Sequence, residues 1–219
     1  MNEPVLVYSQ QWPVAAALEA LLARGNGTPV IPLYTKADLV CHLKDNPRIP
    51  LVFVLSPHEH VVDLYCLQPL LSGRPVLFVA RRFYWTDCRL PAFCGLESYR
   101  CCTWDNLTDS FSRRMEMRYF QLMTADIPAV TSESAPVLTA EQIITRANQW
   151  LYREMENAGL SGYERMVLFL LSESRRSELS TRKLSYYKNS GLGKLGMSRH
   201  VINLYRGIKI RPVLQIRLF

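Results

Sequence analysis

Residues 51–80, LVFVLSPHEHVVDLYCLQPLLSGRPVLFVA, carry the clearest pattern of secondary structure in the chain. It begins with one apolar run, Leu51–Leu55, and ends with another, Pro75–Ala80, and the segment Val62–Leu71 between them reads as a helix. Both runs have strand length and lack a polar face, which is typical of strands that are covered on both sides. A strand, a helix and a strand in succession predict a parallel α/β unit.

The same alternation continues on both sides of this unit. Further strands are predicted at Pro4–Tyr8, Pro29–Tyr34 and Glu97–Cys102, and further helices at Trp12–Arg24, Ala37–Lys44 and Thr103–Met123. Pro32 favours an edge position for its strand, because proline cannot donate to the ladder. Five strands alternating with helices over about 125 residues predict an α/β flavodoxin-like domain with strand order 2-1-3-4-5.

The secondary structure of two further segments in this half is predicted in more detail. Cys88–Gly95 reads as an irregular or short helical stretch. The helix Thr103–Met123 is expected to begin near Thr103 or Asp105 as its cap. Its spacing predicts four inward-facing side chains, Leu107, Phe111, Met115 and Phe120.

The order of elements over residues 4–123 resembles that of bacterial response-regulator receiver domains. Such domains bind Mg²⁺ through acidic residues after the first strand, where this chain has Ser9-Gln10-Gln11, and are phosphorylated on an Asp after the third, where it has Leu55-Ser56. The family's Ser/Thr and Lys positions after the fourth and fifth strands read Val79-Ala80 and Tyr99-Arg100-Cys101. Since Mg²⁺ needs carboxylate oxygens, we expect a pseudo-receiver without cofactor or aspartyl phosphorylation.

Positive charge is concentrated at the other end of the chain. The 219 residues carry 26 Lys and Arg against 19 Asp and Glu, a net charge of +7. From Ser172 onward there are eleven basic and two acidic residues, net +9, whereas the first 171 residues carry 15 basic and 17 acidic residues, net −2. This asymmetry indicates a nucleic-acid-binding module joined to a nearly neutral partner domain.

Metal binding is not indicated by the cysteines and histidines. The six cysteines include no CxxC pair, and reduced thiols are expected because no export signal is recognisable. His58 and His60 would need two further ligands at a recognisable spacing to form a zinc site. We therefore expect no metal site.

Residues Thr124–Pro136, rich in Ala, Ser, Thr and Pro, separate two patterned regions. Thr139 and Gln142 then fit a capping box that opens a helix reaching about Ala158. The sequence thus predicts a pseudo-receiver over residues 1–125, a linker with a linker helix over 126–159 and a third segment over 160–219.

The third segment resembles the C-terminal helix-turn-helix domain of LuxR/NarL-type transcription regulators over about residues 160–210. That family opens with a Leu-Ser/Thr-x-x-Glu helix, and its recognition helix is followed by Lys-Leu-Gly-Val/Met. The matching residues are Leu160, Ser161 and Glu164 in the first helix, Ser180, Arg182, Leu184, Tyr187 and Lys188 in the recognition helix, and Lys194, Leu195, Gly196 and Met197 after it. Ser198–Ile208 matches the closing helix. The resemblance implies an all-α helix-turn-helix domain.

The resemblance also implies the residues that would bind double-stranded DNA. Base contacts fall on Ser185, Tyr186 and Asn189, and phosphate contacts on Arg182, Lys183, Lys188 and Lys194, while Leu184, Tyr187 and Leu192 would pack inward. Only Ser172–Leu179 stand where the family has a scaffold helix, and Gly191 and Gly193 weaken the recognition helix. A second register therefore stays open, in which Ser198–Arg206 is the recognition helix and Arg199, His200, Asn203 and Arg206 face DNA.

The combined expectation is a cytoplasmic transcription regulator that occupies promoter DNA as a homodimer or as a heterodimer with another regulator. No apolar run approaches the length of a membrane helix, so no membrane partner is expected. No phosphate-binding glycine loop or nucleophile–base motif favours an enzyme. The alternative is an adaptor or antagonist that binds a related regulator instead of DNA.

Overall fold

The computed structural model describes residues 4–26, 29–123, 138–175 and 178–217. Its described strands form one parallel five-stranded sheet in the order β2-β1-β3-β4-β5, as the sequence predicts. The strands are β1 (Val5–Tyr8), β2 (Val30–Leu33), β3 (Leu51–Phe53), β4 (Val76–Ala80) and β5 (Tyr99–Thr103). Pro32 lies in β2, an edge strand that pairs with β1 alone in the described sheet.

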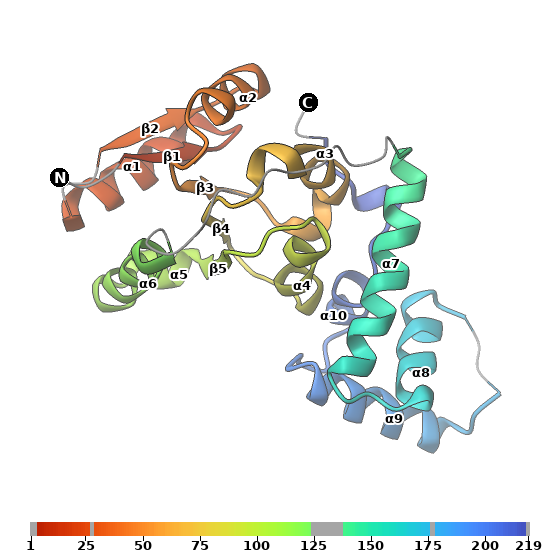
Figure 1. Ribbon diagram of the computed structural model, residues 1–219. Coiled ribbons are helices and arrows are strands. Elements are labelled where there is room, and N and C mark those ends of the chain that lie inside the picture. The colour runs from red at the N-terminus through yellow and green to blue at the C-terminus, as the bar shows by residue number, and fades with distance from the viewer. Residues whose placement is uncertain (1–3, 27–28, 124–137, 176–177, 218–219) are drawn as a thin grey trace.

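Helices cover both faces of this sheet (Figure 1). They are α1 (Trp12–Asn26), α2 (Lys36–Asp45), η1 (Pro57–Glu59), α3 (Val61–Leu71), α4 (Trp85–Phe93), α5 (Trp104–Thr108) and α6 (Ser110–Met123). Alternate strand residues point to opposite faces, so Leu51 and Phe53 join the core on one face while Val52 joins that on the other. A parallel sheet with helices on both faces is the α/β flavodoxin-like architecture that the sequence predicts.

The prediction of one continuous helix over 103–123 is wrong, because the chain is extended at Asp109 and two helices meet there. Asp109 accepts a 2.7 Å hydrogen bond from the Ser112 amide and so caps a new helix. This restart changes the buried face: Phe111 is 67% exposed, whereas Met117 and Phe120 are buried. The expected inward position of Phe111 is therefore wrong.

The second half of the chain is helical and packs against the first. Its elements are α7 (Ala140–Asn157), α8 (Gly162–Ser172), α9 (Thr181–Lys194), α10 (Val201–Gly207) and η2 (Pro212–Leu214). The long helix α7 crosses beside α3 and α4, with the Phe93 and Trp150 rings 6.0 Å apart (Figure 1). The hydrophobic core on this face of the sheet continues through Leu151, Leu168 and Leu192 into the helical half.

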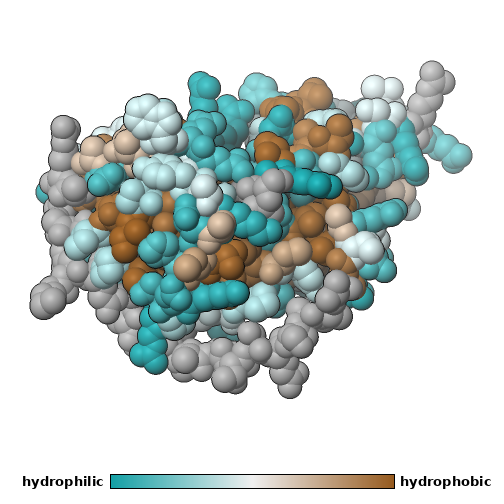
Figure 2. Space-filling view, turned by 90° about the horizontal axis from the view of Figure 1, so that it is seen from above, coloured by the Kyte–Doolittle hydropathy of each residue, from teal (hydrophilic) through white to brown (hydrophobic). Residues whose placement is uncertain are grey.

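The face seen from above carries apolar side chains in separate patches between polar ones (Figure 2). Within the described part of the chain, no helix is both long and apolar enough to cross a membrane.

The buried side chain of Arg74 holds the first half together. It is 1% exposed, and its guanidinium donates to the carbonyl oxygens of Leu43 (3.0 Å), Asn46 (2.7 Å) and Ile49. Burial lowers the pKa of Arg74 to about 10, so the group is still charged at neutral pH. These bonds tie the end of α2 and the loop before β3 to the start of β4.

Replacing Arg74 with methionine is expected to lower the free energy of unfolding by about 3 kcal/mol, because three buried or partly buried carbonyl oxygens lose their donor. Urea unfolding of the full chain measures this. The matched control is Arg48→Met, a change of an exposed arginine in the loop between α2 and β3, with an expected effect below about 0.5 kcal/mol. Equal effects of the two changes would contradict a role for the Arg74 hydrogen bonds.

Candidate nucleic-acid interface

Helix α8 begins as the sequence predicts. The Ser161 hydroxyl accepts from the Glu164 amide (3.3 Å), and the Ser161 amide donates to the Glu164 carboxylate (2.7 Å). Thr139 and Gln142 form the same reciprocal box at the start of α7. These two boxes satisfy amides that the first helical turn leaves without partners.

Glu164 also joins α8 to α9. Its carboxylate accepts from the Lys194 ammonium (2.8 Å) and from the Ser190 hydroxyl (2.6 Å), and it is 4% exposed. Burial acts to raise the pKa of Glu164, but the hydrogen bonds from Lys194, Ser190 and Ser161 outweigh it and lower the pKa to about 2. The two parts of the predicted motif, around residues 164 and 194, thus meet at one charged contact.

The glycines in α9 do not end the helix, which runs unbroken to Lys194. A Cβ at Gly191 would lie 2.9 Å from Cδ1 of Leu168 on α8. Gly191 therefore lets the two helices approach closely, and this packing offsets the helix propensity that glycine lacks.

The outer face of α9 carries most of the predicted DNA contacts. Arg182, Lys183, Ser185 and Tyr186 are exposed, with Tyr186 at 67%. Lys188 and Asn189 are half-buried, and the Asn189 amide donates to the Ser185 hydroxyl at 3.4 Å. On the inner face, Leu192 is buried, and Leu184 and Tyr187 are half-buried. The Tyr187 ring stacks on the Tyr163 ring, with 5.4 Å between the ring centroids.

Lys194 differs from the residues of this outer face because its ammonium has partners within the chain. Its ammonium is bound by the Glu164 carboxylate and by the Gly159 carbonyl (3.0 Å). A cation with two partners inside the domain is a weaker candidate for a phosphate contact than Arg182 and Lys183, which have no partner among the described residues.

The second register draws on residues near α10, which spans only Val201–Gly207. Arg199 and His200 are exposed, but Asn203 is buried and donates to Ser198 at 2.7 and 2.8 Å. Arg206 forms a 2.7 Å ion pair with Glu59 in the first half of the chain. Two of the four side chains of this register are therefore engaged within the chain.

The residues that follow α10 lie against the loop after β3. The Gln215 amide donates to the His58 carbonyl (2.8 Å), and the Ile216 amide donates to the Glu59 carbonyl (2.7 Å). The His58 side chain is buried, and its Nδ1 lies 2.8 Å from the Asp87 carboxylate. Arg211, which the predicted motif does not explain, bonds the Ser172 and Tyr205 carbonyls. The basic end of the chain thus also serves to dock the two halves.

The edge of the sheet where receiver domains carry their acidic residues has a different composition here. Ser9 bonds within its own turn to Gln11 (3.1 Å), and the nearby carboxylate of Glu59 is paired with Arg206. Among the described residues, no group of three His, Cys, Asp or Glu side chains is arranged to hold a metal ion.

Comparison with solved structures identifies the overall arrangement. The DNA complex of the two-component response regulator RcsB matches with a TM-score of 0.55 and 16% identity, over 93% of this chain and 96% of that one. This is the fold of a two-domain response regulator. FixJ from B. japonicum matches 93% of this chain and 94% of its own (TM-score 0.40, 13% identity). A putative pilus assembly-related protein from Burkholderia pseudomallei matches 57% of this chain and 93% of its own, with a TM-score of 0.46 and 15% identity.

At these identities the comparison establishes a flavodoxin-like domain followed by a helix-turn-helix domain and nothing finer. No protein-family model and no curated protein sequence matches the chain. Within the response-regulator fold, the second half departs from the predicted family in one respect: the described residues between α8 and α9, 173–175 and 178–180, contain no helix. The scaffold helix that the family places there is thus absent from the described segment.

Proposed function

We propose that this chain is a cytoplasmic transcription regulator that binds double-stranded DNA through α9 and acts without aspartyl phosphorylation. The observation that carries the proposal is the exposed first turn of α9, where Arg182 and Lys183 have no partner among the described residues. A helix N-terminus flanked by cations attracts phosphates, and the polar residues that follow it suit base edges. The match to a DNA-bound response regulator supports the same reading.

The register that uses α9 is favoured over the one that uses α10. Arg206 and Asn203 would have to leave existing partners to reach DNA, whereas Arg182, Lys183, Ser185 and Tyr186 already face solvent. We further propose that the chain binds as a homodimer or as a heterodimer with a related regulator, because domains of this kind commonly occupy paired half-sites. The domain division 1–125, 126–159 and 160–219 belongs to the proposal, with α7 as a linker helix that also packs on α3 and α4.

Phosphorylation independence follows from the missing carboxylates. Treating the full chain with acetyl phosphate is expected to leave its mass unchanged and its DNA affinity within about twofold, since Ser9, Gln11 and Ser56 cannot bind Mg²⁺ as acidic residues do. Mass spectrometry and a mobility shift with and without the phosphoryl donor measure both. A stable acyl phosphate on the chain would overturn this part of the proposal.

The second candidate is an adaptor that keeps the fold but contacts another regulator instead of DNA. The lack of a helix in the described residues between α8 and α9 favours it, because that helix normally supports the recognition helix against the DNA backbone. A mobility shift at two salt concentrations separates the two candidates. Salt-sensitive binding supports the regulator, and absence of binding to every fragment at low salt supports the adaptor.

A further inference from the structure

Two cysteine thiols lie against each other beside the contact between the two halves. Cys88 on α4 and Cys101 on β5 are neighbours whose side chains shift the pKa of each other. The Cys101 sulfur also lies 3.9 Å from the Asp87 carbonyl oxygen, and the Tyr99 hydroxyl donates to the Cys88 carbonyl at 3.0 Å. These two contacts hold the first turn of α4 against β5 beside the two cysteines.

The alternation of the strand decides which cysteine of the Cys101-Cys102 dipeptide takes part. Cys101 packs on the face of the sheet covered by α3 and α4, whereas Cys102 is buried in the core on the opposite face. Cys94 is fully buried, and its thiol is directed at the Val61 carbonyl. The exposed Cys41 has a different partner, the Asp45 carboxylate at 3.4 Å.

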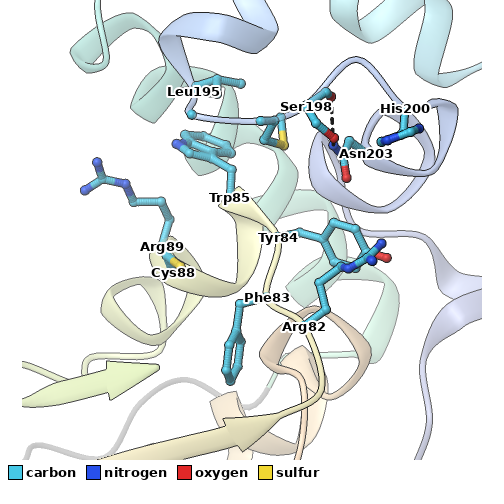
Figure 3. A pocket seen from close by; sticks show the side chains of 12 residues that line it. Arg82, Phe83, Tyr84, Trp85, Cys88, Arg89, Leu195, Ser198, His200 and Asn203 are labelled. Atoms are coloured by element: carbon cyan, nitrogen blue, oxygen red, sulfur yellow. Dashed lines mark hydrogen bonds between the residues drawn. The ribbon is translucent and has the colours of Figure 1, made fainter. Parts of the chain in front are cut away.

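The pair is asymmetric in access and in acidity. Cys88 is exposed and lines a cavity of about 740 Å³ between α4 and the turn that joins α9 to α10 (Figure 3). The neighbouring side chain of Cys101 lowers the pKa of Cys88, against opposing effects of burial and Asp87, and Arg89 adds to the lowering. The same contact, together with burial, raises the pKa of Cys101, which therefore keeps its proton. An accessible thiol of lowered pKa beside a thiol that keeps its proton is the arrangement of an attacking and a resolving cysteine.

We propose that Cys88 and Cys101 are a redox-active pair that a hydroperoxide converts to an intramolecular disulfide. The Cys88 thiolate attacks one peroxide oxygen, the O–O bond breaks, and the sulfur becomes a sulfenic acid while the other oxygen leaves as water after protonation. The Cys101 sulfur then attacks the Cys88 sulfur, and the sulfenic hydroxyl leaves as water with the Cys101 proton. Two thiols and one hydrogen peroxide thus give one disulfide and two waters.

This site is independent of DNA binding, since its formation is measured on the free chain. Its position gives it a route to the second half, because α4 contacts both α7 and α10 and the cavity wall includes Leu195, Ser198 and His200. An effect of oxidation on DNA affinity would rest on the proposed function, whereas the disulfide itself does not.

The test uses the reduced full-length chain, treated with hydrogen peroxide and then with N-ethylmaleimide. The intact mass is expected to fall by two hydrogens before alkylation, and four cysteines are expected to accept the label. Cleavage after arginine gives the peptides 83–89 and 101–113, which should appear as one cross-linked species that dithiothreitol separates. Fragmentation of that species should assign the bond to Cys101 and not to Cys102.

Two variants provide the controls. Cys101→Ser is expected to reduce the cross-link about tenfold or more and to leave a sulfenic acid on Cys88 that dimedone captures, whereas Cys41→Ser should change the yield less than about twofold. A wild-type chain that loses no hydrogens, or one whose disulfide joins other cysteines, would overturn the proposal. Undiminished cross-linking of Cys88 within the Cys101→Ser chain would do the same.

Discussion

Replacing Arg182 and Lys183 together with glutamine is expected to weaken binding to double-stranded DNA about 30-fold at roughly 0.15 M salt. Both side chains are exposed in the first turn of α9, and neither has a partner among the described residues. Each phosphate contact contributes on the order of 1 kcal/mol, and losing two contacts should lower the slope of log affinity against log salt by about 2. Titration of a labelled duplex at three salt concentrations gives both quantities.

The control for this double variant removes the same charge from another helix of the same half. Arg146 and Arg153 are exposed on α7, and their replacement by glutamine should leave the affinity within about threefold and the slope nearly unchanged. If both double variants weakened binding equally, the positive charge would act only through the net charge of the chain, and the assignment of α9 to the DNA interface would fail.

Changing Glu164 to glutamine is expected to lower the free energy of unfolding by about 3 kcal/mol at pH 7. The carboxylate is 4% exposed and binds Lys194, Ser190 and the Ser161 amide, so its loss leaves the Lys194 ammonium without its charged partner. The variant should also weaken DNA binding, because this contact fixes the position of α9 on α8. Chemical denaturation of the full chain at several pH values provides the measurement.

The pH dependence gives a second readout for the same carboxylate. The pKa of Glu164 is about 2 in the folded chain, whereas a glutamate in the unfolded chain has the ordinary value of 4.5. The stabilisation from Glu164 is therefore fully present above about pH 5 and is lost as the pH falls towards 2. The Glu164→Gln variant should lack this part of the acid destabilisation. Glu156, 64% exposed in its pair with Arg165, provides the matched control, and Glu156→Gln should change stability by less than about 1 kcal/mol. Similar losses from both changes would contradict a stabilising role for the buried contact between Glu164 and Lys194.

The order of strands was predictable because each strand is a short apolar run between helical patterns, and Leu51–Leu55 and Pro75–Ala80 show this most clearly. The capping boxes at Thr139 and Ser161 were equally visible, since their partners lie three residues away. The break at Asp109 was missed because the apolar spacing continues through it and only the Asp109–Ser112 cap marks the restart.

The docking of the two halves could not be predicted from the sequence, for a different reason. The pair Glu59 and Arg206 and the bond between Gln215 and His58 join residues about 150 positions apart. No local pattern encodes such contacts. The exposed face of α9 was predictable from the resemblance, whereas the partners of Lys194, Asn203 and Arg206 appeared only with the folded chain.

Selection of bound duplexes from a random library by the full-length chain measures whether α9 recognises DNA sequence. If α9 is the recognition helix, a sequence motif is enriched at low salt. Ser185→Ala and Asn189→Ala are then expected to relax the base preference at individual positions by about 1–3 kcal/mol each, while Gln149→Ala at an exposed position of α7 leaves the motif unchanged. If the unaltered chain retained no duplex of any sequence at low salt, α9 would not be a DNA-binding helix.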